Sequence, residues 1–383
     1  PESRQLRDLI IAIARHPSQN RLGLTRAIAQ DWGWELDPLT ANPADLWEVE
    51  GDQKNREICR TVGDAIALIE DEAAILIDQL ISQNSQELPG ELTRQELAWI
   101  ENILLPNLKK CDREIQNLLR GLDGGYIPSG SSGAPTRGRP DVLPTGRNFY
   151  AVDIRAIPTE TAWRVGQLAA EALVEKYTQD HGEYPQTLGL SVWGTSTMRT
   201  GGDDIAQAIA LLGVQPVWEG ASRRVVDFEI LPISVLGRPR VDVTLRISGL
   251  FRDAFPNLID LFDRAVEMVS QLPETPEENP IAATVYQETT AWVKEGLTED
   301  EAKMRSRLRV FGSKPGAYGA GLQGLIEGQN WTDDSDLAQA YLNWSSYAYT
   351  GGQGISAPQA FANRLQQMQV VLHNQDNREH DIL

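Results

Sequence analysis

The sequence predicts an α/β fold, an open and mostly parallel sheet with flanking helices, preceded by an all-helical region. Three observations carry this prediction. Helical periodicity dominates residues 1–122, glycine and proline then dominate residues 123–150, and two consecutive strand–loop–helix units follow within residues 151–275. Residues 276–383 form a helical and mixed region that is expected to complete the α/β cleft.

The N-terminal region of residues 1–122 shows apolar residues at helical spacing. Leu6 and Ile10 belong to the stripe of a first helix, and further amphipathic helices are expected at residues 22–32 and 56–81. No chemistry can be assigned to this region, so it is expected to be a helical scaffold or a docking surface.

Another helix is predicted over residues 93–119. Thr93 would open it, and Glu96 stands three residues later, where a capping box places its acid. Pro106 lies inside the apolar pattern and is expected to kink the helix.

Residues 123–150 differ sharply in composition from the helices before them. A flexible linker would explain their glycine and serine, but not Arg137, Arg139 and Arg147. A structureless segment of this length inside a compact protein is usually functional or disordered. We expect a lid or a substrate-cradling loop.

The first strand–loop–helix unit begins with an apolar run at residues 188–193. A polar loop with three glycines follows at residues 194–202, and Asp203 and Asp204 then occupy the N-cap region of a helix. Residues 214–218 read as the next strand. In an open α/β sheet, a loop at the carboxyl end of a strand is where ligands bind.

The second unit repeats this order. Residues 223–231 read as a strand, and residues 241–247 alternate with the period of two that is typical of strands. A polar loop at residues 248–253 leads into a helix over residues 258–269. Little hairpin signal separates the two units, which favours a parallel sheet.

The last region is expected to be mostly helical. Helices are predicted over residues 281–308, 334–344 and 357–368, a glycine-rich run occupies residues 310–322, and residues 370–372 have strand character.

Composition excludes some classes of partner. The net charge of −19 argues against nucleic acid or an anionic membrane, because either requires a basic surface. Cys59 and Cys111 match no zinc or redox spacing, which favours a reduced, cytoplasmic setting. No apolar run approaches the ~20 residues of a membrane helix. Both chain ends look cut, so we expect a fragment of a longer protein.

Phosphate chemistry is not favoured. The glycine-rich segments do not match GxxxxGK[ST], GxGxxG or GxSxG, and Lys314 is followed by Pro315. Asp203 and Asp204 would repel a phosphate from the helix start that normally attracts one. We therefore expect that this chain does not bind ATP through a P-loop.

Metal is the better candidate. In a helical conformation, His373, Asp376, Asn377 and His380 would share one face at i, i+3, i+4 and i+7. These nitrogen and oxygen ligands suit Co²⁺ or Zn²⁺ better than Mg²⁺. A solvated charged turn is the alternative.

Several long motifs stand out at residues 133–140, 144–150, 192–207, 237–249, 251–256, 311–321 and 374–381. Together they resemble the cobaltochelatase large-subunit family, which also contains the large (H) subunit of magnesium chelatase. The central motif reads Val-Trp-Gly-Thr-Ser-Thr-Met-Arg-Thr-Gly-Gly-Asp-Asp-Ile-Ala-Gln.

The resemblance implies an ATP-dependent class I metal chelatase, whose large subunit binds the tetrapyrrole and the metal. An AAA+ ATPase motor subunit and its integrin-like partner subunit would hydrolyse ATP, in agreement with the missing P-loop. In the cobalt branch, Co²⁺ is the substrate metal and hydrogenobyrinic acid a,c-diamide, a cobalamin precursor, is the macrocycle. An imidazole at His380, beside two carboxylates, fits a preference for Co²⁺ over Mg²⁺.

The resemblance also implies a site. Asp376, Glu379 and His380 would receive the metal and remove pyrrole protons. The residues expected to bind the macrocycle are Trp193, Arg199, Thr200, Arg246, Arg252, Asp253, Lys314, Tyr318, Arg137 and Asn148. Among these, the guanidinium groups suit peripheral carboxylates or amides, and Trp193 or Tyr318 could stack on the ring or simply pack in the core.

Two family features are missing, a histidine-glycine motif upstream and a Tyr-Tyr-Gln-Phe-Glu-Gly run downstream. This fragment is therefore expected to be inactive alone. Three alternatives stay open: a chelatase for magnesium or another metal, a tetrapyrrole-binding module without insertion activity, and a scaffold that docks the motor.

Overall fold

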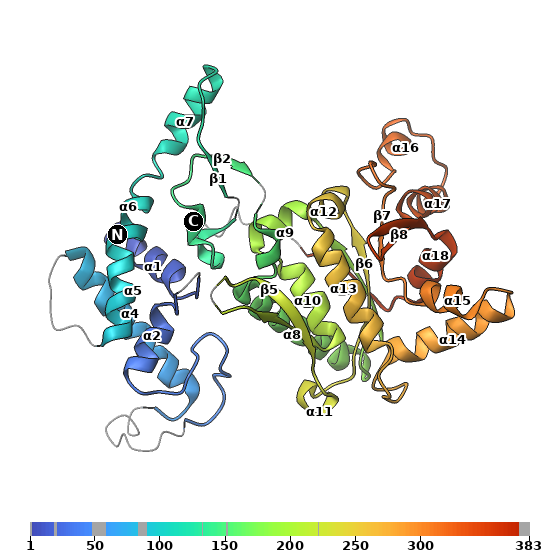
Figure 1. Cartoon of the computed structure of the whole chain (residues 1–383), viewed down its shortest axis with the longest axis horizontal. Helices are drawn as coiled ribbons and strands as arrows, with labels where there is room; N and C mark the ends of the chain where they lie inside the picture. The colour runs from blue at the N-terminus through green and yellow to red at the C-terminus, as the bar shows by residue number, and fades with distance from the viewer. Residues whose placement is uncertain are drawn as a thin grey trace. The chain divides into compact units, whose positions relative to one another are not determined.

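The computed structural model describes residues 2–18, 21–47, 59–82, 90–131, 133–150, 152–220 and 222–374. The chain divides into two compact units, residues 1–152 with 220–223, and residues 153–219 with 224–383. The first unit is mostly helical, and the second contains the main sheet (Figure 1). The predicted fold class is confirmed.

The first unit follows the helical periodicity of the sequence. Its elements are α1 (Glu2–Ala14), α2 (Leu24–Asp31), α4 (Val62–Ser82), α5 (Glu91–Trp99), a π-helical turn (Ile100–Leu104), α6 (Leu105–Leu108), α7 (Arg113–Leu122), β1 (Ser129–Ser131) and β2 (Asn148–Tyr150). The apolar stripes meet in one core, where Ile10, Ile28 and Ile69 are fully buried. β1 and β2 pair in parallel, so the arginine-rich segment that connects them begins and ends at the same small sheet.

Glu96 does not form the predicted capping box with Thr93. α5 begins after Gly90, and its first amides donate to the carboxylate of Asp31, with 2.7 Å between Thr93 N and Asp31 Oδ2. Glu96 is buried and accepts a hydrogen bond from Arg21. The prediction is wrong because a carboxylate from another helix, α2, takes the N-terminus, and local spacing cannot reveal such a partner.

The predicted helix over residues 93–119 is interrupted at two places. The π-helical turn ends at Leu104, two residues before Pro106, whose ring nitrogen has no hydrogen to donate to the preceding turn. Residues 109–112 then form a turn that separates α6 from α7.

The second unit contains the remaining elements. Its first half comprises α8 (Glu160–His181), β3 (Thr187–Val192), α9 (Gly194–Thr200), α10 (Asp203–Leu212), β4 (Val214–Trp218), β5 (Val225–Ile230), α11 (Ile233–Leu236), β6 (Asp242–Ile247), α12 (Gly249–Ala254) and α13 (Pro256–Val269). Its second half comprises α14 (Pro280–Lys294), α15 (Glu299–Ser306), β7 (Val310–Gly312), α16 (Gln323–Glu327), α17 (Asp334–Ser345), β8 (Tyr347–Thr350), β9 (Gln353–Ser356), α18 (Pro358–Gln367) and β10 (Val370–Leu372).

The main sheet has six strands in the order β10-β3-β6-β7-β8-β9, of which the first four are parallel. The register places Leu190 beside Leu245, and Leu245 beside Val310. β6 is buried along almost its whole length, as expected for a strand covered on both faces. α10 packs against β3 and β6. β7 and α18 lie together (Figure 1), and Phe311 of β7 contacts Phe361 of α18 with ring centroids 4.8 Å apart.

Two strands that were predicted within the parallel units form a separate hairpin. β4 and β5 pair only with each other and run antiparallel. Pro216 in β4 has no N–H and therefore suits an edge strand rather than a central one. The β8–β9 hairpin was not predicted, although Gly351 and Gly352 supply the two positive φ angles that a tight hairpin turn requires.

The two segments predicted as polar loops are helical. Residues 194–200 form α9, and Gly201 and Gly202, at φ of 78° and 100°, turn the chain into α10. Gly202, not an aspartate, is the N-cap of α10. Residues 249–254 form α12, and the N-cap hydroxyl of Ser248 accepts a hydrogen bond from Phe251 N at 3.1 Å.

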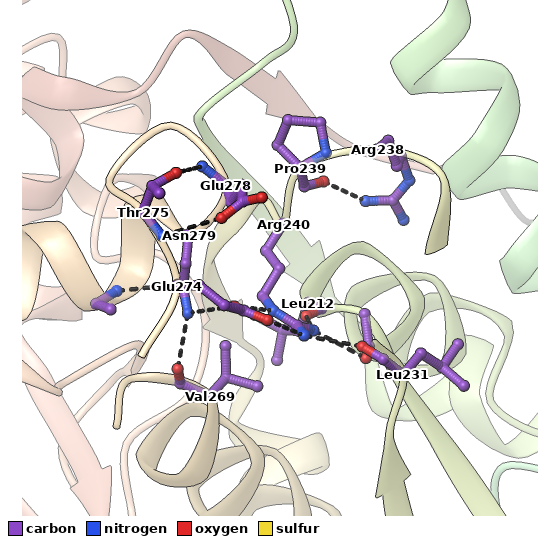
Figure 2. A network of polar contacts seen from close by, with 12 residues as sticks. Leu212, Leu231, Arg238, Pro239, Arg240, Val269, Glu274, Thr275, Glu278 and Asn279 are labelled. Atoms are coloured by element: carbon purple, nitrogen blue, oxygen red, sulfur yellow. Dashed lines mark hydrogen bonds and ion pairs between the residues drawn. The ribbon is translucent and has the colours of Figure 1, made fainter. Parts of the chain in front are cut away.

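Buried ion pairs fix the amino edge of the sheet, where β6 begins. Arg240 is fully buried and donates to both carboxylate oxygens of Glu274, at 2.7 and 2.8 Å. It also donates to the carbonyls of Leu212 and Leu231, which end α10 and follow β5 (Figure 2). Asn279 completes the network with a 2.9 Å bond to Glu274. The Arg240 guanidinium thus binds the carbonyl at the end of α10 and the carbonyl that follows β5 at the same time.

A second buried network starts at Asp242, the first residue of β6. Arg309 donates to it from Nε and Nη2, the latter at 2.8 Å, and Arg364 lies 4.0 Å away and pairs with Glu288. Burial opposes the charged form of Asp242, yet the attraction and hydrogen bonds of Arg309 outweigh it and hold its pKa below the usual range. For Glu288, burial prevails and raises the pKa.

α8 and α10 approach each other closely at Gly166. A Cβ atom at that position would lie 2.5 Å from the backbone nitrogen of Gln207 and 2.7 Å from the side chain of Ala206. Only glycine fits there without moving one of the two helices.

Candidate functional site at the carboxyl edge of the sheet

The four parallel strands of the second unit end at one edge of the sheet. Trp193 follows β3, Ser248 follows β6, Ser313 follows β7 and His373 follows β10. The carboxyl edge of an open α/β sheet is the usual place for a ligand. Because these strands are neighbours, side chains from four distant segments meet there.

Ser248 ties two of these segments together. Its hydroxyl accepts a hydrogen bond from Gly194 N at 3.2 Å in addition to the cap of α12. A Cβ at Gly194 would lie 2.8 Å from Phe251 N, so the backbones of α9 and α12 are in direct contact. The expected loops are therefore a rigid pair of short helices.

Trp193, His373 and Arg246 form an aromatic and cationic cluster. The indole Nε1 of Trp193 donates to His373 Nε2 at 3.0 Å, and the Trp193 ring is partly exposed. The Arg246 guanidinium carbon lies 6.0 Å from the centre of the Trp193 ring and 5.8 Å from that of Tyr341. Arg246 donates to the carbonyl of Gly319 at 2.9 Å, while its enclosed Nε meets no acceptor among the described residues.

Arg252 holds the turn that follows β7. It is largely buried, and its Nη1 donates to the carbonyls of Lys314 and Ala317, both at 2.9 Å. Its Nε and Nη2 pair with Asp253 at 2.6 and 2.8 Å. The Tyr318 hydroxyl donates to the same carboxylate at 2.6 Å. The hydrogen bonds from Arg252 lower the pKa of Asp253, and the bond to Asp253 raises the pKa of Tyr318.

Three further predicted residues are spread over the same edge. The Thr200 hydroxyl is buried and accepts hydrogen bonds from Gly202 N and Asp203 N, both at 3.1 Å, so it joins α9 to α10. Arg199 is exposed on α9, and Lys314 is exposed in the turn that Arg252 holds.

Asn374 carries a contact that sequence reasoning missed. Its amide Nδ2 donates to Asp204 Oδ1 at 2.7 Å and to Gln207 Oε1 at 2.8 Å, and both acceptors on α10 are almost completely buried. The chain that leaves β10 is thereby fixed to the first turns of α10. The sequence signal for this contact was Asp204, because Asp203 already places one acidic residue at the start of the helix.

Several predicted residues are not placed at this edge. Asp376, Glu379 and His380 lie outside the described residues, as does Asn377. Asn148 belongs to β2 of the first unit.

Arg137 also belongs to the first unit, where it closes a 3₁₀ turn, and its side chain lies outside the described part. Among the described residues, no three His, Cys, Asp or Glu side chains gather as metal ligands. No helix in the same part is long and apolar enough to cross a membrane.

A cavity of about 630 Å³ lies elsewhere, between α8 and α11. Glu171, Glu175, Tyr184 and Arg238 contribute to its lining. Tyr184 precedes β3 and Arg238 precedes β6, so this cavity belongs to the amino side of the sheet and not to the site described above.

Known proteins are similar to this chain in sequence and in fold. The CobN/Magnesium Chelatase family model matches residues 1–383. The aerobic cobaltochelatase subunit CobN of Pseudomonas aeruginosa is 48% identical over 100% of this chain and 32% of its own length. The large (H) subunit of magnesium chelatase from Chlorobaculum parvum is 34% identical over 76% of this chain and 23% of its own length.

A solved structure supports the same relation. The catalytic subunit of cobaltochelatase from Mycobacterium tuberculosis matches with a TM-score of 0.65 and 38% identity, over 98% of this chain and 30% of that one. This chain spans about a third of the length of the cobaltochelatase relatives. The chain belongs to the CobN/magnesium chelatase family.

Proposed function

We propose that this chain is part of the large subunit of a class I chelatase and that the carboxyl edge of its sheet holds the tetrapyrrole. The observation that carries the proposal is the cluster of Trp193, Arg246 and His373 beside the rigid turn with Lys314. A flat macrocycle with peripheral carboxylates needs an aromatic or apolar surface and several cations at its rim.

The described side chains divide into two roles. Lys314, Arg199 and Arg246 supply cations for peripheral carboxylates or amides, and Trp193 or Tyr318 can stack on the ring. Arg252, Asp253 and Thr200 do not reach toward a ligand, because their polar atoms are engaged within the chain. These three are positioning residues in this proposal. Arg137 and Asn148, which belong to the first unit, stay proposed as macrocycle-binding residues.

Metal handling is assigned to Asp376, Glu379 and His380. Insertion of a divalent ion displaces the N–H hydrogen at the centre of the macrocycle as a proton, so the site needs a group that delivers the ion and a base that accepts protons. The support for this assignment is that Asn374, two residues before Asp376, is anchored to α10.

Cobalt and a corrin precursor, hydrogenobyrinic acid a,c-diamide, are the proposed substrates. The higher identity to the cobaltochelatase subunits than to the magnesium chelatase subunits, 46–48% against 34–38%, favours this branch. An AAA+ ATPase motor subunit and its integrin-like partner subunit would hydrolyse ATP in a cytoplasmic complex. We propose that the fragment is inactive without the rest of the large subunit.

Absorbance titration of the full-length protein tests the proposal. A metal-free corrin diamide should bind more tightly than a metal-free dicarboxylic porphyrin, and Arg246→Gln should weaken binding about tenfold through loss of a charged hydrogen bond. With the partner subunits and ATP, Glu379→Ala and His380→Ala should abolish cobalt insertion but keep macrocycle binding. Unchanged insertion in both variants would contradict the metal assignment, and preference for the porphyrin would favour the magnesium branch.

A further inference from the structure

His373 accepts a hydrogen bond from its neighbour Trp193. The indole nitrogen of Trp193 can only donate a hydrogen bond, so His373 Nε2 must accept at their separation of 3.0 Å. An imidazole that accepts through Nε2 is neutral and carries its hydrogen on Nδ1. The rings also lie close, with centroids 5.8 Å apart and planes inclined by 37°.

The guanidinium of Arg246 lies beside the Trp193 ring of this pair, with its carbon 6.0 Å from the ring centre. Among the described residues, the only hydrogen-bond partner of His373 is Trp193. The Nδ1–H group therefore meets no acceptor in the described part of the site.

The backbone at His373 is not helical, although the residue spacing allowed a helix there. Residues 373 and 374 continue from β10 without helical conformation, and the side chain of Asn374 is directed to Asp204 and Gln207. His373 is thus tied to β3 through Trp193, and the one-face set of His373, Asp376, Asn377 and His380 does not begin as a helix.

We infer that His373 is a specificity-determining hydrogen-bond donor for the macrocycle and not a metal ligand. Its Nδ1–H would donate to a peripheral carboxylate or carboxamide oxygen, beside the cation of Arg246. Its Nε2, the other possible metal-binding atom, is occupied by Trp193. This inference rests on the proposed function, because it names a contact within the same tetrapyrrole site.

Glutamine at position 373 can imitate both halves of this role. Its amide oxygen can accept from Trp193 while its amide nitrogen donates to the ligand, whereas leucine can do neither. His373→Leu in the full-length protein should weaken binding of a metal-free corrin diamide about tenfold, and His373→Gln should stay within about twofold of wild type.

The pair can also be tested for coupling. Trp193→Phe keeps an aromatic ring but removes the indole donor, so it should weaken macrocycle binding about threefold alone and have no further effect in the His373→Leu background. Cobalt affinity, measured with Co²⁺ alone, should be the same in wild type and in all four variants. Circular dichroism and melting temperatures confirm that each variant is folded.

The outcomes separate the two claims. Equal macrocycle affinity in wild type and His373→Leu overturns the inference and leaves the proposed function intact. Loss of Co²⁺ affinity in both His373→Leu and His373→Gln would identify His373 as a metal ligand and also overturn it. If folded wild-type protein binds neither corrin diamide nor porphyrin, the proposed function fails, and the inference fails with it.

Discussion

The two edges of the main sheet use the same residue types in opposite ways. At the amino edge, Arg240 and Arg309 are fully buried and paired with carboxylates. At the carboxyl edge, Lys314 is exposed and Arg246 lies against aromatic rings. This difference shows that residue type alone does not identify a ligand-binding arginine or lysine in this sequence. Burial and internal pairing separate the two kinds of cation, and Arg252 shows that the carboxyl edge also contains one that holds the fold.

The largest expected effect is a loss of stability when a buried ion pair at the amino edge is removed. Asp242→Ala leaves Arg309 and Arg364 buried without their shared carboxylate, which should cost about 3–5 kcal/mol of unfolding free energy. Denaturant unfolding of the purified protein measures the change. Glu299→Gln removes an exposed pair with Lys303 and serves as the control, expected to unfold like wild type. A wild-type midpoint for Asp242→Ala would show that the buried network carries no net stability.

The next effect tests whether Arg252 belongs to the fold or to the ligand. Arg252→Met removes the hydrogen bonds that hold the turn after β7, at a cost of about 1.5–3 kcal/mol in stability. Because Lys314 is displaced with the turn, macrocycle affinity in an absorbance titration should also fall. Arg264→Gln, which loses a 3.9 Å exposed contact with Asp227 and a cation–π contact with Phe228, is the matched control. Weaker binding without any loss of stability would instead make Arg252 a direct ligand contact.

A smaller effect concerns pH at the amino edge. Asp263 accepts a hydrogen bond from Thr350 at 2.7 Å, but burial raises its pKa above the usual 3.8. The folded state therefore binds this proton more tightly than the unfolded state. Stability from this group increases as pH falls from above the folded pKa toward 3.8.

Asp242 behaves in the opposite sense, since its lowered pKa gives stability that is present above the unfolded value and lost as pH falls. Asp263→Asn should remove the first contribution, so its unfolding free energy should decline more steeply on acidification than that of wild type. Parallel curves of unfolding free energy against pH for the two proteins would refute this.

The smallest expected effect lies at the carboxyl edge. Lys314→Gln should weaken macrocycle binding by no more than about fivefold, because exposed ion pairs contribute only about 0.2–1 kcal/mol. The difference should shrink as salt rises. Lys303→Gln, on exposed α15, should bind as wild type does. A loss that is large and independent of salt would place Lys314 in an enclosed contact.

Local patterns predicted the elements well because their causes are local. The apolar residues at period two in β6 and at helical spacing in α10 are buried in the core, so the parallel core was predictable. Glycine was read as a sign of a loop, and this failed at Gly194, where a glycine is needed because α12 passes within contact distance.

The candidate site was only partly predictable. The strand ends placed Trp193 and Arg246 near each other, since the carboxyl ends of neighbouring parallel strands share an edge. The distinction between Arg246 and Arg252 was not available, because it depends on carbonyls some 60 residues later in the chain, such as that of Ala317. The anchor of Asn374 on Gln207 likewise joins residues that only the folded topology brings together.

The close approach of α8 and α10 has a consequence for anyone who maps this protein by mutation. Gly166 touches the backbone of Gln207, and Gln207 holds Asn374. A bulkier side chain at Gly166 would push α10 and shift the anchor of the chain that leaves β10. A screen for loss of activity would then score Gly166 as strongly as a residue that meets substrate, and only a binding assay beside a folding assay would tell the two apart.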